Sequence, residues 1–126
     1  MSPIASTTLI ASRPPTATPG DPLRMSTAWQ SATVVRISAG GEVDAANSER
    51  LARYVFRYGA NCRHLILDLS GVEFFAVDAF STLRTIGHRC ATAQVNWTLI
   101  PSRAVSRVLT LADPRGVLLS DALIAS

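Results

Sequence analysis

The stretch HLILDLSGVEFFAVD, residues 64–78, decides the fold that we predict for this sequence. It opens with a continuous apolar run, residues 64–69, of the kind found in strands that are buried on both faces. Ser70-Gly71 then predicts the end of that strand. Asp78 is a residue type that caps helices, and apolar residues recur at helical spacing from there to about residue 91. A buried strand followed by a helix is the repeating unit of a parallel α/β sheet.

The same alternation continues on both sides of this stretch. A β-branched run at residues 33–37 ends at Gly40-Gly41 and can pair with an earlier strand at residues 28–30. Further elements are expected along the chain: a helix over residues 45–58 that ends at Gly59, a strand over residues 95–100, a helix that follows Ser102 and ends at Asp113-Pro114, a strand over residues 117–119 and a helical stub over residues 120–126. The order β-β-α-β-α-β-α-β-(α) predicts one α/β domain with a small, mostly parallel sheet and helices packed on it.

The N-terminal segment differs in composition from the rest of the chain. Five of the seven prolines lie in residues 1–24, among many serines and threonines. Such a segment cannot bury enough apolar surface to fold. We therefore predict a disordered tail over residues 1–25 and a folded domain over residues 26–126. Met25 stands at the boundary, and translation that starts there instead of at Met1 is an open alternative.

Composition excludes several classes of function. All 12 basic residues are arginines, so chemistries that depend on lysine, such as the Walker-A phosphate loop and Schiff-base catalysis, are excluded. A net charge of +3 over 126 residues is too low for a dedicated nucleic-acid binder. The sequence contains neither a long apolar span nor a secretory signal, so we expect a cytoplasmic protein without a membrane partner. No catalytic motif or cofactor motif is found, so we do not expect an enzyme.

The two cysteines, Cys62 and Cys90, match neither a zinc-finger spacing nor a CxxC redox pair. Cys62 and His64 would share one face of a strand, but His88 and Cys90 would diverge on a helix, so no metal site is expected. Cys90 falls on the inward stripe of the second helix, which favours a buried thiol. A regulatory disulfide between the two cysteines is the alternative.

Candidate functional residues gather where strands precede helices, because sites in open α/β sheets form at the carboxyl ends of the strands. Two segments qualify, residues 41–47 and residues 68–78. The second segment is too apolar for an ordinary loop, and we expect Phe74 to pack inward. The remaining large apolar residues cannot all turn inward near one helix start, so some of them should form an exposed patch that suits a protein partner. These residues are Phe75, Val77 and Phe80.

Motifs in the two segments resemble those of a known family. Gly41-Glu42-Val43-Asp44, followed by Asn47 and Leu51, and Asp68-Leu69-Ser70-Gly71-Val72, followed by Phe74, resemble the STAS domain of bacterial anti-sigma factor antagonists, of the actinobacterial type. The resemblance covers nearly all of residues 28–120 and implies a STAS-like fold. It also implies binding to an anti-sigma factor, usually an ATP-dependent serine kinase. Such binding releases a sigma factor and so regulates transcription, as in stress responses. In that family the kinase phosphorylates a serine at the start of the second helix, which ends the binding.

This sequence departs from the family at the phosphorylation motif. The family's D-S-S-G falls on Ala76-Val77-Asp78-Ala79, so Asp78 occupies the position of the phosphoacceptor serine. A serine kinase cannot modify Asp78, whose carboxylate is a permanent negative charge at a helix N-terminus. Constitutive antagonism, a partner adapted to the carboxylate, and a form held partly off are all open. Ser81 and Thr82, within one helical turn, are fallback phosphoacceptors.

We therefore predict a partner-binding face formed by the second segment, the helical turn that follows it and the Asp44 loop. Its predicted residues are Asp44, Asn47, Phe75, Ala76, Val77, Asp78, Phe80, Ser81 and Arg84. Asp44 and Asp78 would select the partner electrostatically, with Arg84 able to pair with either, and both aspartates also fit helix N-caps. Two alternatives remain open. One is a STAS module that senses a small ligand in a cavity lined by Phe75 and Phe80. The other is a non-phosphorylatable scaffold subunit that associates with itself, for example as a homodimer.

Overall fold

A computed structural model describes residues 21–116 and 122–124 of the chain. Its strands are β1 (Leu23–Trp29), β2 (Val34–Val43), β3 (His64–Phe75), β4 (Asn96–Ile100) and β5 (Ala122–Ile124). Its helices are α1 (Ser48–Tyr58), the short 3₁₀ turn η1 (Val77–Ala79), α2 (Phe80–Thr92) and α3 (Arg103–Ala112). In the part of the chain that is described, no helix is long and apolar enough to cross a membrane.

The strands form one sheet in the order β1-β2-β3-β4-β5. β1 and β2 form an antiparallel hairpin, and every following strand pairs in parallel with the strand before it. Parallel neighbours need a crossover, and α1, α2 and α3 supply the three crossovers. The predicted small, mostly parallel α/β sheet is therefore confirmed. This topology places the carboxyl ends of β2, β3 and β4 at one edge of the sheet.

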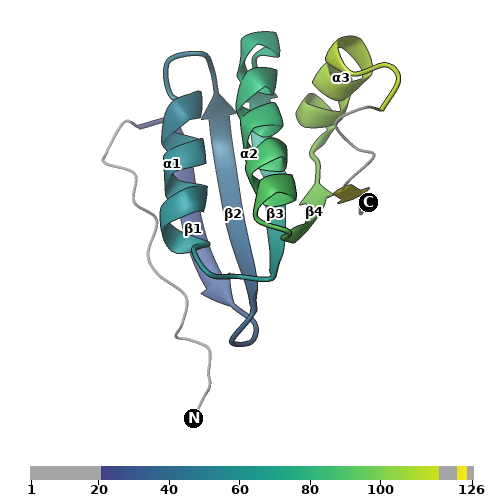
Figure 1. Ribbon diagram of the computed structural model, residues 1–126. Coiled ribbons are helices and arrows are strands. Elements are labelled where there is room, and N and C mark those ends of the chain that lie inside the picture. Colours follow the sequence, from purple (N-terminus) through teal and green to yellow (C-terminus); the bar gives the residue numbers. More distant parts are fainter. Residues whose placement is uncertain (1–20, 117–121, 125–126) are drawn as a thin grey trace.

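The two faces of the sheet differ in how deeply their side chains are buried. Figure 1 shows α1 and α2 side by side across one face. On that face alternate residues are fully buried, among them Val35 and Ile37 of β2 and Leu65 and Leu67 of β3. The side chains between them point to the opposite face, where most are only partly buried. They include Val34, Arg36, Ser38, His64, Ile66 and Thr98.

The ends of two helices follow the sequence signals. Ser102 caps α3, and its side-chain oxygen accepts a hydrogen bond from the Val105 amide at 3.1 Å. Gly59 ends α1, and a Cβ built there would lie 2.7 Å from the Val55 carbonyl oxygen. Both predictions are confirmed. The helices predicted to start at residues 45 and 78 start instead at Ser48 and Phe80, because residues 45–47 form a turn and residues 77–79 form the 3₁₀ turn.

Gly40-Gly41 and Ser70-Gly71 do not end the strands, contrary to our prediction. β2 continues through Gly40-Gly41, and β3 continues through Ser70-Gly71, with shifts in their pairing register at this point. Gly41 adopts a φ of 93°, and a Cβ there would lie 1.9 Å from the Pro22 carbonyl oxygen. Glycine is needed because the hairpin partner passes so closely. These glycines mark a bulge within long strands rather than their ends.

Both termini of the predicted domain need correction. Leu23 is fully buried, and the Asp21 carboxylate lies 2.7 Å from the Arg50 guanidinium, so residues 21–25 belong to the folded domain. Met25 lies inside β1, and residues 1–20 of the predicted tail lie outside the described residues. At the other end, residues 122–124 form β5 where we predicted a helical stub, and the strand predicted at residues 117–119 lies outside the described residues.

Candidate functional site

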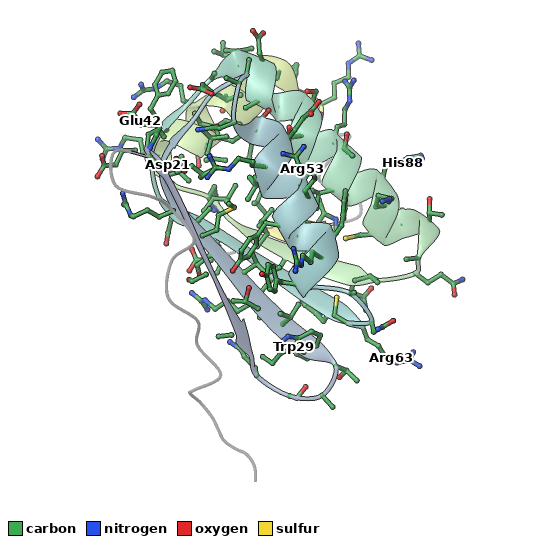
Figure 2. All side chains as sticks on the ribbon, turned by 90° about the vertical axis from the view of Figure 1, so that its left-hand side faces the viewer. Asp21, Trp29, Glu42, Arg53, Arg63 and His88 are labelled. Atoms are coloured by element: carbon green, nitrogen blue, oxygen red, sulfur yellow. The ribbon has the colours of Figure 1, made fainter. Side chains whose placement is uncertain are left out.

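The two candidate segments meet at the carboxyl ends of β2 and β3. Val43 pairs with Phe75 in the last rung of the parallel ladder, and the Ala76 amide donates a hydrogen bond of 2.9 Å to the Val43 carbonyl. The Asp44 loop therefore lies directly beside the chain that leads into η1. Figure 2 shows Glu42 and Asp21 at this end of the sheet and Arg63 at the opposite end. The predicted juxtaposition of the two segments is confirmed.

Asp44 and Asn47 hold each other in a reciprocal pair of hydrogen bonds. The Asn47 side-chain oxygen accepts from the Asp44 amide at 2.9 Å, and Asp44 Oδ1 accepts from the Asn47 amide at 2.9 Å. Asn47 Nδ2 also donates to the Glu42 carbonyl at 3.0 Å. Asn47 is only 8% exposed, and it is the residue before α1, so the prediction that Asp44 caps this helix is wrong. Asn47 braces the loop from within, while Asp44 stays half-buried at its rim.

The aromatic residues face the opposite way from our expectation. Phe74, which we expected to pack inward, is 52% exposed. Phe75 and Phe80 are core residues with 4% and 7% exposure, so the exposed apolar surface here consists of Phe74 and Val77, the latter 54% exposed. The β2–β3 ladder contains two register shifts, and each adds one residue to β3. Together they restore the alternation set by Leu65 and Leu67, so Phe75 faces the core as these residues do and Phe74 faces outward.

Asp78 lies in the middle of η1 with its side chain exposed to solvent. Ala76 and Ala79 occupy the positions before η1 and α2, and neither side chain makes a capping hydrogen bond, so the prediction that Asp78 is an N-cap is wrong. The Asp78 carbonyl accepts a hydrogen bond from the Ser81 hydroxyl at 3.1 Å. Asp78 therefore presents a carboxylate beside Val77 that is available to a partner.

Three further predicted residues differ in their access to solvent. Ser81 is exposed, but Thr82 is only 6% exposed, so of the two fallback phosphoacceptors only Ser81 can be reached by a kinase. Arg84 is exposed, and its guanidinium lies 5.9 Å from the centre of the Phe80 ring. Within residues 21–116, no ion pair joins Arg84 to Asp44 or Asp78.

A polar network around Asp68 was not predicted from the sequence. Asp68 Oδ1 accepts from the Ser70 amide at 2.9 Å and from the Ser70 hydroxyl at 2.6 Å, and Asp68 Oδ2 accepts from Arg36. Burial raises the pKa of Asp68, but the bonds from Ser70 and the Arg36 charge outweigh it and hold that pKa below its usual value. The network lies between β2 and β3 beside the bulge, and it stabilises the strand ends from which the site loops emerge.

The cysteines and histidines do not form a metal site within the described ranges, 21–116 and 122–124. His64 Nε2 lies 2.8 Å from the Thr98 hydroxyl, on the sheet face that the helices do not cover. Cys62 precedes β3 and lies on the helical side, so the strand spacing that would bring it to His64 does not apply. Cys90 is a buried free thiol, as predicted, and Cys62 is a half-buried free thiol.

The profile of the STAS domain matches residues 27–114, so the chain belongs to the STAS domain family. Osmosensory protein A of Mycobacterium tuberculosis (strain ATCC 25618 / H37Rv) is 39% identical over 74 residues, which are 59% of this chain and 46% of that protein. The chain thus spans about half the length of this relative.

Two solved structures share the fold. The anti-sigma factor antagonist SpoIIAA in its unphosphorylated form superposes with a TM-score of 0.63 at 14% identity, covering 81% of this chain and 88% of that one. An anti-sigma factor antagonist from Mycobacterium paratuberculosis superposes with a TM-score of 0.60 at 20% identity, covering 71% of this chain and 76% of that one. The predicted STAS-like fold is confirmed.

Proposed function

We propose that this STAS domain is an anti-sigma factor antagonist, a cytoplasmic binding protein rather than an enzyme, which releases a sigma factor by occupying its anti-sigma factor. The observation that carries the proposal is the surface at the carboxyl ends of β2 and β3. There the exposed side chains of Phe74 and Val77 lie in a segment that also presents Asp78, next to the Asp44 loop. Apolar residues flanked by charge are the composition of a specific protein interface.

The chemistry of this surface defines the partner that it fits. Phe74 and Val77 require an apolar contact, and Asp78 and Asp44 require basic groups around it. Burying either carboxylate without a positive partner would cost several kcal/mol, roughly, so a neutral or acidic rim would be rejected. We propose an anti-sigma factor of the ATP-binding serine-kinase type, as the family resemblance implies, whose rim has adapted to a permanent carboxylate at position 78.

Calorimetry with the anti-sigma factors encoded in the source genome tests the binding surface. Replacing Phe74 and Val77 together by serine should weaken binding by about 1–3 kcal/mol, roughly five- to 150-fold, because the exposed apolar contact is lost. The matched control is Leu111→Ser, which removes an apolar side chain of 68% exposure from α3 and should leave the affinity unchanged. Equal effects of the two changes would show that this surface is not the interface.

The kinase type of the partner is tested by mass spectrometry with ATP. The wild-type chain should gain no phosphate at position 78, whereas Asp78→Ser should gain one when the partner kinase is present. The same variant carrying Ser81→Ala should still be modified, which separates the motif position from the exposed fallback serine. An unmodified Asp78→Ser chain that still binds the kinase and ATP would rule out the phosphorylation part of the proposal.

Self-association is the competing function, in which the domain serves as a scaffold. Sedimentation of the full chain, alone and with the anti-sigma factor, distinguishes the antagonist function from the scaffold function. We expect an antagonist to bind its anti-sigma factor at concentrations where it does not bind itself. A stable dimer that captures no anti-sigma factor would favour the scaffold.

A further inference from the structure

A cavity of about 370 Å³ lies at the opposite end of the sheet from the proposed interface. It is open to solvent and is bordered by the last turns of α1 and α2, the loop between α1 and β3, and the first residues of β3. The lining residues are Val55, Phe56, Gly59, Ala60, Asn61, Cys62, Leu65, Arg89, Cys90, Thr92, Ala93 and Val95. Most of them are apolar or small, and the size falls in the range of small-molecule sites, roughly 300–1,000 Å³.

One positive charge stands at the rim of this cavity. The Arg89 guanidinium lies 4.2 Å from the centre of the Phe56 ring, and both residues belong to the cavity wall. Among the described ion pairs none involves Arg89, so its charge is not neutralised by a carboxylate of residues 21–116. A guanidinium that is already held on an aromatic face is oriented before a ligand arrives, which favours a planar anionic group.

The two thiols that line the cavity, Cys62 and Cys90, carry no charge. Burial raises the pKa of Cys90 to about 11, and the nearby Cys62 adds to this, while burial also raises the pKa of Cys62. Both thiols are therefore protonated at neutral pH and behave as small apolar groups. Because thiolate is needed for disulfide exchange, the same shifts disfavour the regulatory disulfide considered above.

The mouth of the cavity is shaped by two residues in an unusual conformation. Asn61 has a φ of 69° and lines the cavity, and Gln94 has a φ of 58° between the lining residues Ala93 and Val95. Asparagine adopts this left-handed conformation readily, but for glutamine it is uncommon. The Gln94 amide donates a hydrogen bond of 3.2 Å to the Ala91 carbonyl, so its left-handed conformation turns the chain from the end of α2 toward β4 beside the cavity.

We propose that this cavity binds a small monoanionic ligand with an apolar body, such as an aromatic or short-chain carboxylate. The body would lie against Val55, Leu65 and Val95, and the carboxylate would pair with Arg89. The proposal concerns a site distinct from the anti-sigma surface and does not depend on the proposed function. A ligand cavity lined by Phe75 and Phe80 would be a different site, and both of these residues belong to the core.

The test uses the full chain and 2-naphthoate as the probe, with 2-naphthamide as its neutral match. The naphthoate should bind and should slow the alkylation of Cys62 by N-ethylmaleimide, followed peptide by peptide, because Cys62 lines the cavity and is the more accessible thiol. The amide, and the naphthoate with Arg89→Gln, should bind about fivefold more weakly through loss of the charge pairing. The control Arg53→Gln, on the exposed face of α1 and away from the cavity, should bind normally.

A further variant fills the site. Ala93→Phe, at an exposed position in the cavity wall, should abolish binding without unfolding the chain. Naphthoate that leaves the alkylation rate of wild-type Cys62 unchanged would overturn the site, whatever the variants do. Equal binding of the amide and the carboxylate would overturn the anionic class of ligand.

Discussion

Replacing Asn47 by alanine separates a structural role for this residue from the direct partner contact that the sequence predicts. The change removes two side-chain hydrogen bonds, one from the Asp44 amide at 2.9 Å and one to the Glu42 carbonyl at 3.0 Å. Each backbone group left without its partner costs roughly 1–1.5 kcal/mol, and Asn47 is only 8% exposed, so water replaces these bonds poorly. We expect the free energy of unfolding to fall by about 2 kcal/mol and the melting temperature to fall by about 8–15 °C.

Urea unfolding followed by the fluorescence of Trp97, which is 1% exposed in the native state, measures this loss. The control is Glu49→Ala in the first turn of α1, whose side chain is 84% exposed and makes one ion pair of 3.6 Å with Arg53. The control should change stability by less than about 0.5 kcal/mol, because exposed ion pairs contribute little. If Asn47→Ala left the unfolding midpoint where it is and weakened only partner binding, Asn47 would be a contact residue and the bracing role would be refuted.

Two further predictions concern stability. The pKa of Asp68 is held below its unfolded value, so its ionised form stabilises the fold above about pH 4, and this stabilisation is lost as the pH falls through the lowered folded value. Acid titration of stability should therefore be shallower in Asp68→Asn, and parallel curves for the two proteins would contradict the network. A chain that starts at Met25 lacks Leu23, which is fully buried, and should unfold about 1.5–3 kcal/mol more easily than a chain that starts at Asp21. Equal urea midpoints would show that Leu23 does not contribute to the core.

Local sequence patterns predicted the elements of the fold better than their ends. The apolar run before Asp68 and the cap at Ser102 are short-range signals, and both predictions hold. The glycines at 40–41 and 71 misled the prediction, because a glycine that breaks a strand and a glycine that allows a neighbouring strand to approach look alike in sequence. For Gly41, the position of Pro22, which comes from another part of the chain, decides between them.

The site shows the same division between local and tertiary information. That the two loops adjoin follows from parallel topology alone, and it was predicted. Whether Phe74 or Phe75 faces outward depends on how many residues the register shifts add to β3, because one added residue reverses the faces of the strand and the two observed here restore them. Leu23 was assigned to the predicted tail because the composition of residues 1–24 is that of a disordered segment. A single apolar residue gives no periodic pattern, so its place in the sheet is known only from its partner strand.

The carboxylate at position 78 changes how such a domain can be controlled. A phosphate adds a charge of about −1.5 to −2 and can be removed, whereas Asp78 carries its single charge permanently. Under the proposed function, control by a ligand elsewhere on the chain would need an element that links the two ends of the molecule, and α2 is such an element. It runs 13 residues, roughly 20 Å, from the turn that carries Asp78 to the cavity wall at Arg89 and Cys90. A ligand that shifts the last turn of α2 moves a rigid rod whose first turn borders the proposed interface. If both proposals hold, saturating 2-naphthoate should alter the affinity for the proposed anti-sigma partner, and by linkage that partner should alter the affinity for 2-naphthoate by the same factor.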